Sequence, residues 1–227
     1  MGLLDTYGDQ LVSAFWTTVQ LTFWSALGAL IWGTLLAAMR VSPVPILRIF
    51  ATWYVNIFRN TPLTLIIVFC SVGLYQNLGV YFAPEDSPKF IDQNNFRLAV
   101  LGFVVYTAAF VCESLRSGIN TVPLGQAEAA RSLGLTFTQS VRMIVLPQAF
   151  RAVIAPLGSV LIALTKNTTI ASAIGVAEAS LLMKTMIENE ADKLFLVFAI
   201  FAIGFMILTL PVGFLFGYLG KRLAVKR

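Results

Sequence analysis

The sequence contains no histidine and few charged residues. Only 12% of its 227 residues are Asp, Glu, Lys or Arg, whereas 58% are hydrophobic. Without histidine, the chain lacks the commonest metal ligand and the usual proton shuttle near neutral pH. Its charged share is about half that of a typical soluble domain. The composition therefore excludes an ordinary soluble domain and indicates a polytopic membrane protein.

The sequence also lacks paired cysteines and a nucleotide-binding loop. Cys70 and Cys112 stand apart in apolar runs, which predicts small buried hydrophobic side chains. No segment fits the G-x-x-x-x-G-K-[ST] pattern, since the nearest text, "GYLGKR" at 217–222, lacks the spacing and the hydroxyl. No metal constellation or nucleophile–base pair stands out. We therefore expect a chain that is not an enzyme and holds no cofactor or metal of its own.

Long hydrophobic runs, by contrast, recur along the whole chain. A membrane-spanning helix needs about 20 mostly apolar residues. The predicted spans are Phe15–Met39, Phe50–Leu78, Leu98–Ser114, a fourth that begins after Pro147 and resumes near Ile170, and Leu194–Leu219. "RNTP" at 59–62 interrupts the second span, and "TKNTT" at 165–169 interrupts the fourth. The predicted fold class is an all-α polytopic membrane protein with about five spans, forming one domain over 1–227.

The charges divide between the two ends of these spans. The net charge of +5 could indicate a nucleic-acid binder, but in a membrane protein it more often reflects a cytoplasmic excess of Lys and Arg. Basic residues gather in the 40–48 connection, in the loop at about 118–146 and in the C-terminal tail. Acidic residues fall at the opposite ends. With five spans, we expect the N-terminus outside, the C-terminus in the cytoplasm, and no nucleic-acid partner.

The loop at about 118–146 has the signals of two short helices. Pro123 suits the first turn of a helix, and Gly134 suits the left-handed residue just past its end. Within that helix, Glu128 and Arg131 stand three residues apart and can pair. "TFTQ" at 136–139 predicts a capping box and a second helix that runs to Pro147. The loop is therefore expected to be a helix–turn–helix.

The same loop resembles a known family. It contains E-A-A at 128–130, then three residues, Gly134, nine further residues and "IVLP" at 144–147. This pattern is the signature of permease subunits of ATP-binding-cassette (ABC) importers. "FRNTPL" at 58–63 and "LPQAFRAVIAP" at 146–156 resemble the polar amino-acid branch of this permease family. The sequence as a whole resembles most the glutamate-uptake permeases of actinobacteria. Many relatives have Ser in place of Thr169, a change that keeps the hydroxyl.

The resemblance implies a type I importer permease in a bacterial cell membrane. Its partners would be a second permease subunit, identical or homologous, two cytoplasmic ATPase subunits that hold ATP and Mg, and an extracytoplasmic binding protein. The loop helix would dock on an ATPase subunit through Gly125, Glu128, Ala129, Ala130, Arg131 and Gly134. The alternatives are a helix that packs only on its own chain and a standalone channel or ion-coupled transporter.

Four ionisable residues remain within the predicted spans: Arg59, Glu113, Lys166 and Glu178. Charges inside a membrane are costly, so they pair or line a cavity. Arg59 lies roughly 16 Å beyond Arg48 at 1.5 Å per residue, near the bilayer midplane. Helices broken at this depth are how transporters hold small charged solutes. Glu178 is expected nearer the outer rim.

These features predict a solute pocket at the two breaks. Its residues would be Arg59, Asn60, Thr61, Glu113, Lys166, Asn167, Thr168 and Thr169. A cation with a helix N-terminus suits an α-carboxylate, and a second cation favours glutamate or aspartate over arginine. The alternative is structural: Arg59 and Glu113 form an ion pair, and Lys166 caps carbonyls at the break.

Overall fold

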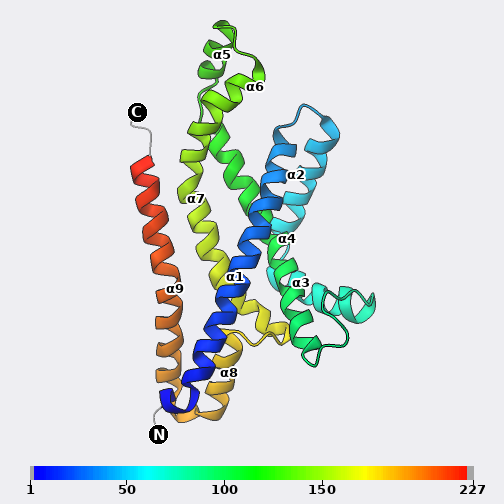
Figure 1. The fold of residues 1–227 in the computed structure, drawn as a ribbon, viewed down its shortest axis with the longest axis vertical. Helices are drawn as coiled ribbons and strands as arrows, with labels where there is room; N and C mark the ends of the chain where they lie inside the picture. The colour runs from blue at the N-terminus through cyan, green and yellow to red at the C-terminus, as the bar shows by residue number, and fades with distance from the viewer. Residues whose placement is uncertain (1–2, 224–227) are drawn as a thin grey trace.

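A computed structural model describes residues 3–223, and every regular element in that range is helical (Figure 1). The elements are α1 (Leu3–Val41), α2 (Pro45–Asn60), α3 (Leu63–Val68), the π-helical η1 (Phe69–Asn77), α4 (Phe90–Asn120), α5 (Leu124–Ser132), α6 (Phe137–Ser140), the π-helical η2 (Val141–Val145), α7 (Leu146–Asn167), the 3-10 helix η3 (Thr168–Ile174), α8 (Ala179–Asn189), the 3-10 helix η4 (Ala191–Lys193) and α9 (Leu194–Leu223).

Within residues 3–223, four helical stretches are each long and apolar enough to cross a membrane. They run over Leu3–Val41, Phe90–Asn120, Arg142–Ile174 and Ala191–Leu223. A fifth crossing results when α2 is counted with α3 and η1, which bend by 103° at a short break. The predicted all-helical class with about five spans is therefore confirmed.

The first span starts earlier than the sequence predicted. Helix α1 begins at Leu3 and runs to Val41 without a break, because one face of its first turns is buried. Leu3, Tyr7 and Leu11 recur at helical spacing and pack in one cluster with Met186 of α8 and Phe201 of α9. This packing extends the helix beyond the apolar run that hydropathy detects.

The fourth span also differs from its prediction, which placed the end of the loop helix at Pro147. The chain stays helical from Phe137 through Asn167, and Pro147 lies in the first turn of α7. Proline there lacks the N–H that would continue the regular bonding pattern, and the π-helical stretch Val141–Val145 directly precedes it. The loop therefore passes into the membrane span as one helical path.

Small residues bring the long helices close together. A Cβ added at Gly33 of α1 would lie 2.6 Å from Val111 Cβ and 2.8 Å from the Ala108 carbonyl of α4. A Cβ at Gly118 of α4 would lie 2.1 Å from Val153 Cγ1 of α7. Only glycine permits these two crossings, so α4 is clamped between α1 and α7.

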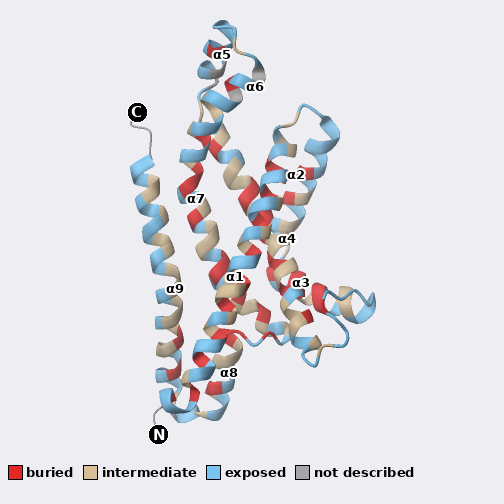
Figure 2. Ribbon diagram, viewed as in Figure 1, coloured by how far each residue is buried: buried red, intermediate tan, exposed pale blue. Residues whose placement is uncertain are grey.

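Gly213 and Gly217 of α9 form a G-x-x-x-G pattern, which can permit close contact between membrane helices. A Cβ at Gly213 would meet Ile162 Cδ1 at an ordinary 3.5 Å, and one at Gly217 would meet nothing within 4 Å. The tight α7–α9 approach instead uses Gly158, where an added Cβ would lie 2.4 Å from Phe216 Cβ. Much of α9 faces outward, with Val197 and Phe201 buried near its start (Figure 2). Such an apolar outer surface suits lipid tails.

The two ends of the molecule differ in charge. The α1–α2 connection, α5, α6 and the end of α9 lie at one end, and the start of α1 lies with α8 at the other (Figure 1). Basic residues mark the first end, with Arg40 in the last turn of α1 and Lys221 and Arg222 in the last turn of α9. Acidic residues mark the second, with Asp5 in the first turn of α1 and Asp192 in η4.

Candidate functional site

The first break in the membrane helices follows Arg59. Helix α2 ends at Asn60, Thr61 and Pro62 are extended, and α3 begins at Leu63. Pro62 cannot continue the helix, and its carbonyl accepts the N–H of Leu65 at 3.0 Å. The chain therefore turns by 103° between α2 and the helix that begins with α3.

Polar side chains at this break bond to carbonyls one turn back in α2. Asn60 Nδ2 donates to the Asn56 carbonyl at 2.7 Å, and Thr61 Oγ1 donates to the Ile57 carbonyl at 2.8 Å. Asn60 is exposed and Thr61 half-buried. Thr61 also lines a hollow of about 590 Å³ inside the bend, walled by Phe58, Phe69 and other apolar side chains.

Glu113 of α4 lies between Arg40, at the end of α1, and Arg59, at the end of α2. Its Oε1 is bonded by Arg40 Nη1, and Arg59 Nη1 lies 3.6 Å from its Oε2. The Arg40 side chain is 10% exposed, whereas that of Arg59 is 49% exposed. The ion pair of Arg59 with Glu113 that the sequence allowed is present, but Arg40 is the nearer partner and sequence reasoning missed it. Arg40 and Glu113 are 73 residues apart, and no local pattern links them.

The second break falls at Lys166–Thr169, where α7 passes into the 3-10 helix η3. Thr168 is fully buried and donates to the Thr165 carbonyl at 2.7 Å, while Thr169 Oγ1 donates to the Lys166 carbonyl at 2.8 Å. Lys166 itself is exposed, and Asn167 is half-buried. The hydroxyls therefore cap the carbonyls here, and within residues 3–223 no hydrogen bond or ion pair of the Lys166 amino group is seen.

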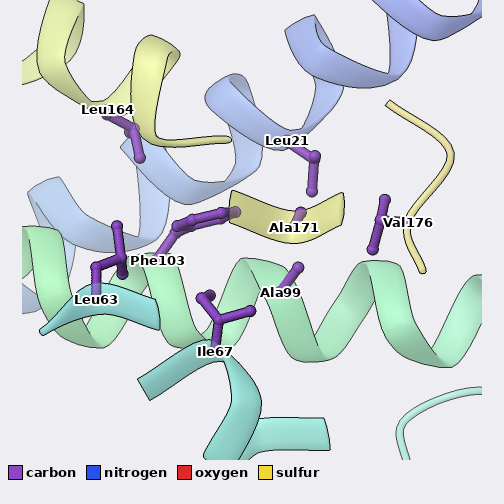
Figure 3. Packing of buried hydrophobic residues seen from close by; sticks show 8 residues of the cluster. All are labelled: Leu21, Leu63, Ile67, Ala99, Phe103, Leu164, Ala171 and Val176. Atoms are coloured by element: carbon purple, nitrogen blue, oxygen red, sulfur yellow. The ribbon is translucent and has the colours of Figure 1, made fainter. Parts of the chain in front are cut away.

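The two breaks share one apolar cluster. Leu63, directly after the first break, and Leu164, shortly before the second, both belong to the cluster around Phe103 (Figure 3). Ala171 of η3 joins it together with Ile67. Among the described residues, no hydrogen bond or ion pair joins the polar groups of one break to those of the other. The packing brings the segments together and leaves their polar side chains to other partners.

Glu178, expected near the outer rim, is completely buried between η3 and α8. Its carboxylate accepts the backbone N–H of Ser180 at 2.8 Å and of Leu181 at 3.0 Å, so it caps α8. The next residue, Ala179, donates its N–H to Thr18 of α1 at 3.2 Å. Burial raises the pKa of Glu178 to about 7. Its role in the structure is a helix cap.

The loop between α4 and α7 has the predicted helix–turn–helix. The N–H of Thr136 donates to Gln139 Oε1 at 2.9 Å, and the N–H of Gln139 donates to Thr136 Oγ1 at 3.3 Å, which forms the predicted capping box. Gly134 has a φ of +85° and ends α5 as expected. Pro123 lies one residue before α5 rather than inside its first turn.

Helix α5 presents its charged side chains to the surroundings. Glu128, Ala129 and Arg131 are all exposed, but no ion pair links Glu128 to Arg131 in the described part of the chain. An exposed pair of this kind gains little in water. Ala130 is 2% exposed and faces its own chain, whereas Leu133, an apolar residue that sequence reasoning did not single out, is 83% exposed.

The start of α5 is open and is tied to the next span. A Cβ added at Gly125 would meet no atom within 4 Å, which leaves room for another surface to approach closely. The neighbouring Gln126 accepts a hydrogen bond of 2.6 Å from Gln148 of α7. A hydrogen bond therefore connects α5 to the helix that carries Lys166.

Comparison with known proteins agrees with this arrangement. A family described as the inner membrane component of binding-protein-dependent transport systems matches residues 11–225. Two curated relatives are named "Glutamate transport system permease protein GluC". One, from Corynebacterium efficiens, is 67% identical over 220 residues, or 97% of this chain and 96% of the relative. The other, from Corynebacterium glutamicum, is 66% identical over the same shares.

A solved structure has the same fold. It is described as an amino acid ABC transporter with histidines, is 28% identical, and aligns with a TM-score of 0.84 over 96% of both chains. The chain therefore belongs to the family of inner membrane components of binding-protein-dependent transport systems. It is a multi-pass membrane protein and a non-enzymatic permease subunit.

Proposed function

We propose that this chain is the transmembrane subunit of an ATP-driven importer for an acidic amino acid, with glutamate as the solute. The two relatives described above are named as glutamate transport permeases and align over nearly their whole length. In such an importer this chain supplies the path across the membrane. The work of ATP hydrolysis falls to separate subunits, which hold ATP and Mg.

The observation that carries the solute proposal is the half-exposed Arg59 at the first break. Its guanidinium lies 3.6 Å from Glu113, beyond ordinary hydrogen-bond length, so its donors remain open to another anion. An arginine binds a carboxylate through two parallel N–H···O bonds, which adds geometry to charge. A half-exposed arginine at a helix break suits a carboxylate of the solute.

The second break supplies a second cation. Lys166 is exposed at the end of α7, and its segment packs against α3 through the cluster of Figure 3. Two carboxylates of one solute would suit two cations, which favours glutamate or aspartate over arginine. The proposed solute-binding residues are Arg59, Asn60, Thr61, Lys166, Asn167, Thr168 and Thr169. Glu113, which the sequence pattern grouped with them, is instead the ion-pair partner of the arginines Arg40 and Arg59.

The loop provides the proposed contact with the ATPase subunits. Gly125, Glu128 and Arg131 are exposed on or beside α5, and Leu133 offers an apolar anchor next to them. The basic end of the molecule is placed in the cytoplasm and the acidic end outside, where the binding protein delivers the solute. A second permease subunit, identical or homologous, completes the path.

Co-expression with the products of neighbouring genes tests this assembly. The complex should co-purify with two ATPase subunits and a second permease subunit, identified by mass spectrometry, and glutamate with its binding protein should stimulate ATP hydrolysis. Transport by this chain alone in vesicles without ATP would contradict the proposal and indicate an ion-coupled transporter or channel.

A further inference from the structure

We infer that Arg40 is a positioning residue of the solute site: by holding Glu113, it leaves Arg59 free for a solute carboxylate. This inference rests on the function proposed above. It assigns a role to Arg40, which lies at the end of a different helix and nearly out of reach of solvent. Its partner Glu113 is thereby a positioning residue as well, rather than a ligand for the solute.

The helices that carry the three side chains are locked together by an apolar cluster. Leu36 and Ala37 of α1, Ala51 and Val55 of α2, and Cys112 of α4 are buried in it. Arg40 follows one turn after Leu36, and Glu113 follows Cys112 directly. The packing of α1 against α4 therefore fixes where the Arg40–Glu113 contact forms.

The two arginines contact Glu113 unequally. Arg40 bonds Oε1 and is 10% exposed, while Arg59 stands 3.6 Å from Oε2 and is 49% exposed. At 3.6 Å, Arg59 Nη1 attracts the Glu113 carboxylate by charge but is too far away to donate a hydrogen bond to it. Arg59 is thus held in place by charge and keeps its donors for another partner.

The three groups together carry one positive charge in excess. Both guanidinium groups stay protonated in proteins, and Glu113 supplies a single negative charge. An excess positive charge on partly buried groups attracts an anion. One further carboxylate neutralises the cluster, and it approaches Arg59 more readily, because the Arg59 side chain is 49% exposed and that of Arg40 only 10%. The cluster is therefore selective for an anionic group.

Replacing Arg40 should weaken solute binding, although Arg40 does not itself contact the solute. In Arg40→Gln, Glu113 has Arg59 as its remaining partner, so the pair is neutral and Arg59 is occupied. Glutamate affinity should fall about 5- to 10-fold, the difference between a charge-assisted and an ordinary hydrogen bond. In Glu113→Gln, Arg59 stays free and affinity should not fall. In the double variant Arg40→Gln/Glu113→Gln, affinity should return towards the original value.

The measurement is binding of radiolabelled glutamate to the purified permease–ATPase complex without the binding protein, scored per assembled complex. Arg48→Gln is the matched control, since Arg48 is an exposed arginine of α2 whose loss should leave affinity unchanged. If Arg40→Gln assembles and binds glutamate normally, or if the double variant binds as weakly as Arg40→Gln, the inference is wrong.

A second comparison keeps the inference testable if Arg40→Gln does not assemble. In the Glu113→Gln background, Arg40 has no carboxylate to hold, so adding Arg40→Gln should not change affinity. A further loss there would mean that Arg40 binds the solute itself and would overturn the inference. Arg59→Ala separates the two claims: normal glutamate binding in that variant refutes the proposed solute site, whereas weak binding with a normal Arg40→Gln refutes the role of Arg40 alone.

Discussion

Gln148 of α7 donates a hydrogen bond of 2.6 Å to the side-chain oxygen of Gln126 on α5. Gln148 also donates to the Ile144 carbonyl at 3.0 Å, which fixes its direction. Helix α7 runs over 22 residues from Leu146 to Asn167 and contains Pro156. The bond therefore links the loop helix to the helix that carries Lys166 and leads into the second break.

Replacing Gln148 should weaken coupling while leaving docking intact. Gln148→Ala removes the donor to Gln126 on an exposed surface, so the fold should survive. Transport per ATP hydrolysed should fall about 2- to 10-fold, as expected for one hydrogen bond. Uptake and hydrolysis are measured in the same reconstituted vesicles. Gln76→Ala, an exposed glutamine of η1, is the control, and equal coupling in both variants would contradict the transmission role.

Glu128→Lys should uncouple the subunit from its ATPases. The substitution reverses a charge on the exposed face of α5, while helix propensity changes little. The chain should insert normally but lose ATPase subunits on purification. Glu188→Lys makes the same reversal on an exposed residue of α8 and should have no effect. ATPase subunits that still co-purify with Glu128→Lys and respond to solute would show that α5 does not dock there.

Arg59→Ala should weaken solute binding and leave assembly intact. Loss of a charge-assisted hydrogen bond of about 1.5–3 kcal/mol corresponds to roughly a 10- to 150-fold loss of affinity. Assembly should survive because Glu113 remains bonded to Arg40. The yield of assembled complex and its basal ATP hydrolysis are measured alongside glutamate binding. Poor assembly that Glu113→Gln restores would instead indicate that Arg59 is a structural partner of Glu113.

Glu178 should make the protein less stable as the pH rises from 5 to 8. Burial raises its pKa to about 7 in the folded chain, above the ordinary value of about 4.5 for a glutamate side chain. A carboxyl whose pKa rises on folding stabilises the fold below the unfolded pKa, and this contribution is lost as pH rises through the folded value. Between pH 5 and 8, Glu178→Gln should therefore lose less thermal stability than the original protein. If the melting temperatures of Glu178→Gln and the original protein change in parallel between pH 5 and 8, the raised pKa of Glu178 is refuted.

The elements that follow from local chemistry were predictable. Pro62 forces the break in the second span, and the capping box of Thr136 with Gln139 forms as its spacing indicates. Gly134 takes the left-handed conformation that ends α5. In each case the deciding residues are neighbours in sequence, so the pattern carries the structural information.

The features that the sequence did not reveal depend on distant partners. Glu113 binds Arg40 because α1 packs on α4, and hydropathy marked Arg40 only as a charge at a span end. Ala130 is buried by the fold of its own loop, although its signature suggested a partner surface. Glu178 is buried because α8 folds back onto α1 and needs a cap. Tertiary packing decides each of these.

The most direct test of the account is uptake into proteoliposomes that contain the complete complex and its binding protein. Labelled glutamate should accumulate only when ATP is present on the ATPase side, unlabelled aspartate should compete more strongly than arginine, and Arg59→Ala should reduce accumulation. Accumulation without ATP, or stronger competition by arginine than by aspartate, would contradict the proposal that this chain forms the path of an ATP-driven importer for acidic amino acids.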